Sequence, residues 1–400
     1  MAKLPLRSWL TLLVCFVVLT IAFSFGLFSL PQFYPSLVRS LHWSRASAAA
    51  GGSIVLLLVG ALSPAVGALV DRFQPKAVLV GGMCLVGLAL ALLSTARSRA
   101  EYYAFCTILG AGTSAVSILP NSILIGPWFT RNRGLAVGFV NAGIGLGGVA
   151  PTITAFEIAR RGVAGAFLFL AACIAIPLIL TLAVVQKGEG GGRGGARAPS
   201  FAELARMPMF WIFGISLFFT AHAMLGIQQN LVLYLTGEGL PAQPAARVLS
   251  IALMAAAFGK LMSGALADRL SARAGMLFSI SCVALGILAL LQTPAQSSWL
   301  APPAALFGIG YGGIFNASPT IIFEHFGAHQ VGKSLGLFYV FFGLGTATGG
   351  ALAALLADRT RGYAAPFTLD LALACAALLL MIASGRQTQP AARLRLSKAL

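Results

Sequence analysis

Long apolar runs, each about 20 residues or more, limit most strongly how this chain can fold. The first of them extends from Trp9 to Val38 without a charged residue. A helix of that length crosses the hydrocarbon core of a bilayer. A transmembrane barrel would instead alternate apolar and polar residues over about 10 positions, and these runs do not alternate. The sequence therefore predicts an all-α integral membrane protein.

The composition leads to the same class. Of the 400 residues, 58% are hydrophobic and only 9% are charged, whereas soluble domains carry about 25% charged residues. The net charge of +17 raises the question of nucleic acid. The lysines and arginines, however, lie at the ends of apolar runs and form no basic face with interleaved aromatic residues. The lipid bilayer is therefore the expected partner, and nucleic acid is not.

Twelve transmembrane helices are predicted where apolar runs end at charged residues or at proline and glycine. Their ranges are 9–38, 46–70, 76–96, 101–128, 134–158, 163–186, 208–236, 245–267, 274–292, 298–325, 333–357 and 363–385. The segment Gln186–Arg206 is rich in glycine, which is typical of a flexible hydrophilic linker. The predicted organisation is a six-helix bundle at 1–186, a cytoplasmic linker at 187–206 and a second, pseudo-symmetric six-helix bundle at 207–400.

The two predicted bundles repeat one another in sequence. GALVDR, at Gly67–Arg72, returns as GALADR at Gly264–Arg269. RGLAVG, which begins at Arg133, is echoed by KSLGLF, which begins at Lys333. Two similar six-helix halves are the signature of an internally duplicated secondary transporter. The expected mechanism is alternating access, in which the halves rock about a central site.

The distribution of positive charge predicts the orientation. Seventeen lysines and arginines fall in the termini, the linker and the loops on their side, and nine fall in the opposite loops. Positive residues are enriched on the cytoplasmic side of membrane proteins. Both termini are therefore expected in the cytoplasm of a cell whose inner membrane holds the protein. Lys260 is the one positive residue that belongs to neither set.

The motif GALVDRFQPK resembles the short loop, G-x-x-x-D-R/K, that the major facilitator superfamily carries between its second and third helices. The resemblance covers essentially the whole chain and implies the twelve-helix fold of that superfamily. It also implies that charged residues at the cytoplasmic helix ends latch the inward face and do not bind substrate. These gating candidates are Asp71, Arg72, Asp268, Arg269 and Arg133.

Three further runs resemble the oxalate/formate antiporter and monocarboxylate transporter branch of the superfamily. They are WFTRNRGLAVG at Trp128–Gly138, SFGLFSLPQFYPSLVRSLHWSRASA at Ser24–Ala48 and FGKLMSGALADR at Phe258–Arg269. The chain departs from that branch at His42, where glycine is usual, at Lys260, where arginine is usual, and at Ala256, where aspartate is usual. The branch resemblance implies that the residue at Lys260 contacts a substrate carboxylate.

Lys260 is the strongest candidate for substrate binding from the residues themselves. It lies about eight residues, or roughly 12 Å of helix, from the cytoplasmic end of its span, too far for its side chain to reach the headgroups. A positive charge at that depth costs about 2.5–3.5 kcal/mol and is usually functional. The first half of the chain has Ser63 at the corresponding position. Lys260 either binds an anion in a central cavity or pairs structurally with Asp370.

Other polar residues in the predicted spans complete the candidate site. The substrate-binding set is Lys260, Asn121, Tyr339, Asn316 and Gln229. Each uncharged member is equally consistent with a hydrogen bond between helices. His222 and Asp370 are the proton-coupling candidates, because they are the histidine and the acid that lie deepest in predicted spans. A packed, neutral His222 is the alternative.

These features predict a secondary transporter that carries a small organic anion, a monocarboxylate, with proton coupling. The alternatives are an exchanger of dicarboxylates and a carrier of a neutral or cationic apolar compound. The sequence contains no HExxH motif, no GxSxG motif and no pair of aspartates within one span, so none of these signs of an intramembrane enzyme is found. We expect no cofactor or metal site, and we expect a monomer.

Overall fold

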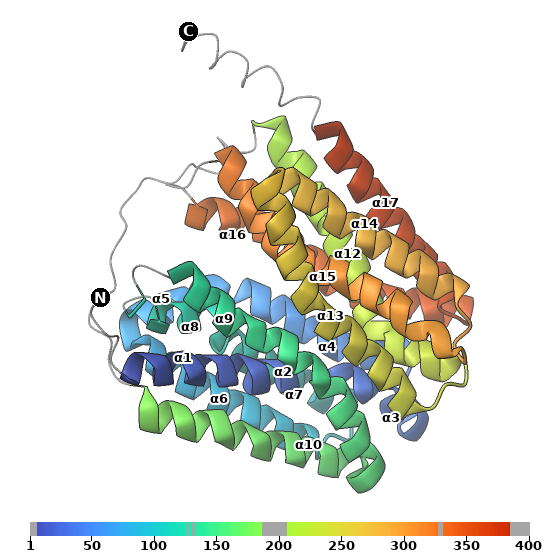
Figure 1. Ribbon diagram of the computed structural model, residues 1–400. Helices are drawn as coiled ribbons and strands as arrows, with labels where there is room; N and C mark the ends of the chain where they lie inside the picture. The colour runs from blue at the N-terminus through green and yellow to red at the C-terminus, as the bar shows by residue number, and fades with distance from the viewer. Residues whose placement is uncertain (1–5, 126–127, 130–132, 186–205, 327–330, 385–400) are drawn as a thin grey trace.

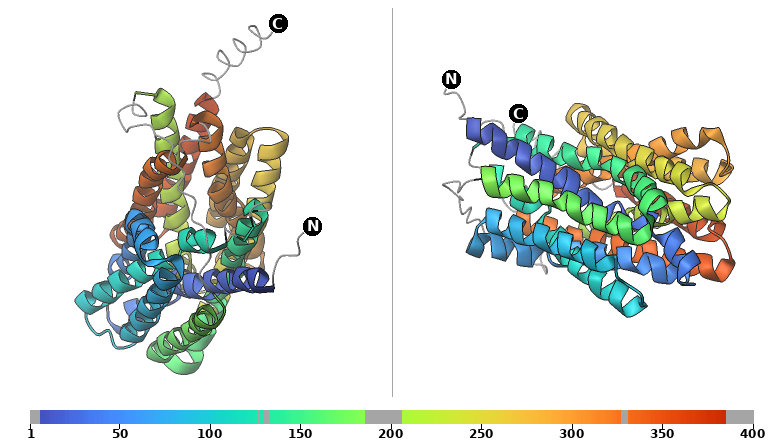
Figure 2. Two further views of the ribbon diagram at one scale, coloured as in Figure 1. Left: turned by 90° about the vertical axis from the view of Figure 1, so that its left-hand side faces the viewer. Right: turned by 90° about the horizontal axis from the view of Figure 1, so that it is seen from below.

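The computed structural model describes residues 6–125, 128–129, 133–185, 206–326 and 331–384. Every element within these ranges is helical. Nine helical segments there are long and apolar enough to cross a membrane. Figure 1 shows the helices gathered in two groups, one formed by residues that precede 186 in the chain and one by residues that follow 205. In the left view of Figure 2 the blue to green group lies below the yellow-green to red group.

The first group contains the elements from α1 to α10, and several of its predicted spans are interrupted. Their bounds are α1 Leu6–Val18, η1 Leu19–Phe23, α2 Ser24–Leu27, η2 Leu30–Gln32, α3 Tyr34–Ser40, α4 Arg45–Ala61, α5 Ser63–Phe73, α6 Pro75–Leu93, α7 Arg99–Ala115, α8 Ile118–Ile125, α9 Arg133–Leu146, η3 Gly147–Val149 and α10 Ala150–Val184. Gly162 has φ 71° inside α10, a conformation that glycine adopts at little cost. This kink separates the predicted spans 134–158 and 163–186.

The second group is built from longer, less interrupted helices. Their bounds are α12 Pro208–Gly237, α13 Ala242–Arg269, α14 Ala272–Gln292, η4 Ser298–Leu300, α15 Ala301–Phe326, α16 Val331–Thr360 and α17 Ala364–Ser384. The all-α membrane fold predicted from the sequence is therefore confirmed. The division of the chain at residues 187–206 stays a prediction, because residues 186–205 lie outside the described part of the structure.

Equivalent contacts in the two groups reflect the sequence repeat. Near the start of α6, Lys76 Nζ donates to the Leu182 carbonyl at the end of α10, over 3.0 Å. Near the start of α14, Arg273 donates to the Met381 and Ile382 carbonyls at the end of α17. Cations satisfy the free carbonyls and the negative dipole of a helix C-terminus. Both groups therefore close the same helix end with the same chemistry.

We call the side on which α1 begins and α17 ends the inner side, and the opposite side the outer side. The right view of Figure 2 shows the helices of both groups running roughly along one common direction. The groups contact each other through α4 and α16, and through α13 and the α9–η3–α10 segment. These two pairs of helices are equivalent under the sequence repeat.

Glycines let α13 and α15 approach each other closely. A Cβ at Gly308 would collide with the Ala252 backbone, and one at Gly312 would collide with the Ala256 backbone. Such small residues at helix interfaces are typical of membrane bundles. The C-terminal group therefore depends on the absence of side chains along one face of α15.

We expect Gly308→Ala to lower the stability of the purified protein by about 1–3 kcal/mol, because overpacking displaces rigid backbone. The measurement is the thermal unfolding midpoint in detergent. Gly81→Ala in α6 is the matched control, since a Cβ at Gly81 meets no atom within 4 Å. Equal midpoints for the two variants would contradict the close approach of α13 and α15.

Candidate functional site

Lys260 lies on α13, nine residues before its last residue, Arg269. That separation corresponds to about 14 Å of helix. Asn316 on α15 donates from Nδ2 to the Lys260 carbonyl over 3.1 Å. Among the described residues, no carboxylate pairs with the Lys260 ammonium. The structure therefore presents an ammonium group deep in a span without an acidic partner in the described part of the chain.

Asn141 lies on α9, which packs against α13 from the other group of helices. A Cβ at Gly145, one turn further along α9, would lie 2.9 Å from the Ala257 Cβ of α13. Asn141 is four residues inward of Gly145 on α9, and Lys260 is three residues inward of Ala257 on α13. Asn141 Oδ1 is buried and has no hydrogen-bond partner in the described residues.

The sequence analysis missed Asn141, and the repeat held no signal for it. Arg133 matches Lys333 at an offset of 200 residues, which pairs Asn141 with the apolar Phe341 and not with Tyr339, a predicted site residue. The Tyr339 side chain lies outside what the structure describes. Asn141 and Lys260 thus lie on two helices, α9 and α13, that pack together where the two groups meet.

Asn121 has a structural task in addition to any contact with substrate. The helix stops between α7 and α8 at Val116, four residues before Pro120, because a proline ring clashes with the carbonyl at that spacing. Asn121 Nδ2 donates to the freed Val116 and Ser117 carbonyls over 3.2 and 2.8 Å. Asn121 therefore satisfies two of the carbonyls at the interruption before Pro120.

Gln229 belongs to a layer of buried amides nearer the outer side. Tyr34 on α3 donates to Gln229 Oε1 over 2.7 Å, which joins the two groups of helices. Tyr311 on α15 donates to Gln228 Oε1 over 3.3 Å. The Nε2 atoms of Gln228 and Gln229 have no partner in the described residues. Gln229 thus contributes to the junction between the groups.

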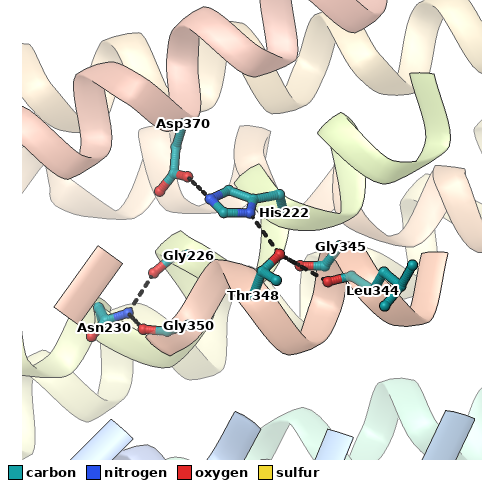
Figure 3. A network of polar contacts seen from close by, with 8 residues as sticks. All are labelled: His222, Gly226, Asn230, Leu344, Gly345, Thr348, Gly350 and Asp370. Carbon is teal, nitrogen blue, oxygen red and sulfur yellow. Dashed lines mark hydrogen bonds and ion pairs between the residues drawn. The ribbon is translucent and has the colours of Figure 1, made fainter. Parts of the chain in front are cut away.

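His222 and Asp370, the two proton-coupling candidates, lie side by side (Figure 3). His222 Nε2 on α12 is 3.8 Å from Asp370 Oδ1 on α17. His222 Nδ1 is 2.9 Å from Thr348 Oγ1 on α16. Both titratable side chains are buried. Asp370 therefore meets His222, which disfavours the alternative that it pairs with Lys260.

The two groups also meet at their outer ends through Asp358, near the end of α16. Its Oδ1 accepts from the Arg45 backbone N–H over 3.1 Å and its Oδ2 from the Ala46 backbone N–H over 2.9 Å. These are the first N–H groups of α4, which lack partners inside the helix. The third, on Ser47, donates to the Ser44 side chain. A carboxylate at a helix N-terminus is favourable both as an acceptor and as a negative charge. The sequence analysis did not find this contact, which we call the outer latch.

The predicted inner gate falls mostly outside the described part of the structure. This applies to the side chains of Asp71, Asp268 and Arg133. Arg72 and Arg269 are exposed at the inner ends of α5 and α13. The Arg72 guanidinium lies 5.1 Å from the centroid of the Phe73 ring. The gating role of these residues stays a prediction.

The helical arrangement, the repeat and the polar residues between the groups define a polytopic membrane transporter of duplicated architecture. The family model described as Major Facilitator Superfamily matches residues 14–350 and 248–398. The chain belongs to this superfamily. It is accordingly a transporter and not an enzyme, as the sequence predicted.

Curated relatives include three transporters with different printed functions. The MFS transporter asaE of Aspergillus flavus is 26% identical over 326 residues, which cover 78% of this chain and 71% of that protein. Monocarboxylate transporter 3 of Rattus norvegicus is 27% identical over 379 residues, with coverage of 90% and 76%. The oxalate:formate antiporter of Oxalobacter formigenes is 26% identical over 306 residues, with coverage of 74% and 72%. The resemblance to this branch is therefore confirmed at low identity.

Solved structures confirm the fold. The nucleoside transporter NupG aligns with a TM-score of 0.76 at 14% identity and covers 95% of this chain and 100% of that one. A bacterial homologue of the human lysosomal transporter Spinster, in an inward-facing and unoccupied conformation, aligns with a TM-score of 0.75 at 15% identity, with coverage of 96% and 98%. At these identities the likeness shows the fold alone.

Proposed function

We propose that the protein carries a small organic anion, a monocarboxylate, across the inner membrane by alternating access, with both termini in the cytoplasm. The observation that carries this proposal is the Lys260 ammonium, which has no acidic partner among the described residues. A half-buried charge inside a membrane span, without an opposite charge beside it, is unfavourable until such a charge arrives. A substrate carboxylate supplies that charge.

The site favours one carboxylate over two. In the described residues, Lys260 is the cation that lies away from the helix ends. The lysine ammonium group acts as a point charge, whereas an arginine guanidinium would form a bidentate contact with a carboxylate. Two of the relatives are named a monocarboxylate transporter and an oxalate:formate antiporter, which supports a carboxylate substrate. Dicarboxylate exchange is the second candidate, because oxalate appears in one of those names.

Alternating access is supported by where the two groups of helices touch. The outer latch and the Tyr34–Gln229 hydrogen bond join them on the outer half of the molecule. Thr152 on α10 and Ser250 on α13 add a further contact over 2.8 Å between their hydroxyl oxygens. We propose that residues 1–186 and 207–400 rock as two halves and that the described conformation is closed on the outer side.

Transport of radiolabelled anions into proteoliposomes tests the proposal. We expect uptake of at least one of formate, acetate and oxalate, and competition by the other carboxylates. Tetraphenylphosphonium and uridine serve as cationic and neutral comparisons. Uptake of either comparison without uptake of any carboxylate would contradict the proposal and would favour a carrier of neutral or cationic compounds. Preference for oxalate over formate and acetate would favour dicarboxylate exchange.

A further inference from the structure

His222, Asp370 and Thr348 lie at the junction of three helices in the C-terminal group, and in the described structure they form no hydrogen bond or ion pair with Lys260. His222 comes from α12, Thr348 from α16 and Asp370 from α17 (Figure 3). We infer that His222 and Asp370 share one exchangeable proton and that Thr348 is the positioning residue that turns His222 Nε2 toward Asp370. This inference rests on the proposed anion transport and names a site for the proton coupling that the sequence predicts.

The hydrogen bonds of Thr348 favour one tautomer of the His222 imidazole. The Thr348 hydroxyl donates to the Leu344 carbonyl over 2.8 Å, with a second acceptor, the Gly345 carbonyl, at 3.2 Å. A hydroxyl has one proton to donate. Toward His222 it therefore acts as the acceptor, and His222 Nδ1 carries the proton of that hydrogen bond. In the neutral ring Nε2 is then a bare acceptor.

Asp370 stands where that bare nitrogen points. Its Oδ1 lies 3.8 Å from Nε2, while its Oδ2 is buried without a hydrogen-bond partner in the described residues. The carboxylate lies directly against Gly226 of α12, where any side chain would collide with it. A buried carboxylate without donors is unfavourable as an anion. The fold thus makes room for the Asp370 side chain beside Gly226 but supplies no donor to its Oδ2 in the described residues, which favours the protonated carboxyl group.

One proton changes the net charge of this unit from −1 to 0. The incoming proton adds to the lone pair of His222 Nε2 or to Asp370, and no other bond forms or breaks. Among the described side chains of the neighbouring elements, no other charged group pairs with His222 or Asp370. In the described residues, Asp358 and Arg359 lie at the outer end of α16, Arg273 of α14 binds carbonyls at the inner end of α17, and Lys260 lies on α13.

The unit also contacts the helix that closes the outer side. Two residues beyond Thr348, the Gly350 carbonyl of α16 accepts from Asn230 of α12 over 2.9 Å. Ten residues beyond Thr348, Asp358 forms the outer latch. A change in charge at His222 therefore acts on α16 directly, through its hydrogen bond to Thr348.

Nitrogen NMR of the purified full-length protein, with ¹⁵N-labelled histidine and without substrate, tests this inference independently of what the protein transports. The chain has 4 histidines, and loss of a signal in His222→Gln assigns the one of interest. We expect a neutral ring protonated at Nδ1 and a change in signal from about pH 9 to about pH 5, which brackets the ordinary histidine titration. Asp370→Asn should shift this transition.

Variants of Thr348 separate positioning from mere packing. Thr348→Ser should keep the Nδ1-protonated form, whereas Thr348→Val should lose it while filling the same volume. Thr346→Val is the control, because the Thr346 hydroxyl bonds the Gly343 carbonyl and not His222. A neutral His222 protonated at Nε2 in the unmodified protein, an Nδ1 form unchanged in Thr348→Val, or a signal that stays constant across this pH range would overturn the inference. Absence of anion uptake, by contrast, would overturn only the proposed function.

Discussion

Lys260→Gln should lower anion uptake by roughly 10- to 100-fold, because a hydrogen bond to a charged group contributes about 1.5–3 kcal/mol. Glutamine keeps most of the length and some hydrogen-bonding capacity of lysine but removes the charge that a carboxylate requires. Insertion and folding should improve or stay unchanged, since a charge in the membrane costs about 2.5–3.5 kcal/mol. The measurement is initial uptake rate per molecule of reconstituted protein.

The controls for Lys260 distinguish the role of its charge from that of its position. Lys260→Arg should retain uptake, because it keeps a positive charge and adds donors. Arg247→Gln removes an exposed positive charge near the outer end of the same helix and should leave uptake within about twofold, as surface charges contribute little. An uptake rate in Lys260→Gln equal to that of the unmodified protein would contradict the proposal that this lysine binds the anion.

The broad architecture could be predicted because it follows from length and periodicity. The apolar runs predict membrane-spanning helices, and the repeat of Gly67–Arg72 at Gly264–Arg269 predicts two related halves. The interruptions were harder to predict. The break at Gly162 falls between two predicted spans, whereas the π-helical turn at Leu19–Phe23 lies inside one. Nothing in the apolar composition of that stretch marks where helical hydrogen bonds change register.

Single residues of the candidate site could be predicted where their chemistry is unusual for a bilayer. Lys260, His222 and Asp370 stand out because ionisable groups are costly there. Asn141 and Thr348 do not stand out, because a neutral polar side chain in a membrane helix usually bonds its own backbone. Their importance depends on which face of another helix they meet, and that is a property of the fold.

Asp358 illustrates a contact that neither local sequence nor the repeat predicts. It lies next to Arg359 near a helix end, where an exposed acid would be unremarkable. Its partners are backbone N–H groups 312 and 313 positions away in the chain, and backbone groups leave no signature in side-chain identity. The N-terminus of α4 binds Asp358 only because the fold packs α16 against α4.

Asp358→Asn should therefore open the outer side of the transporter. The substitution keeps the size of the side chain but removes its charge and one of the two acceptor oxygens that hold the Arg45 and Ala46 N–H groups. Loss of a charge-assisted hydrogen bond costs about 1.5–3 kcal/mol, so the population of outward-open molecules should rise by roughly 10-fold or more. Anion affinity measured from the outer side should rise with it, since more molecules present an accessible site.

The accessibility of a cysteine placed behind the outer latch measures this change. Ser53 on α4 is 7% exposed and lies beside Gly350 of α16, so Ser53→Cys in a background without the native cysteines reports separation of the two helices. A membrane-impermeant thiol reagent added from the outer side should modify it faster in Asp358→Asn. Arg359→Gln, which alters the neighbouring exposed charge, should leave the rate unchanged. The outer latch is an electrostatic contact between the Asp358 carboxylate and the N-terminus of α4. Because salt screens such a contact, high salt should also speed labelling in the unmodified protein. Equal labelling rates in Asp358→Asn and the unmodified protein would mean that the apolar contacts between α4 and α16, and not this carboxylate, hold the outer side closed.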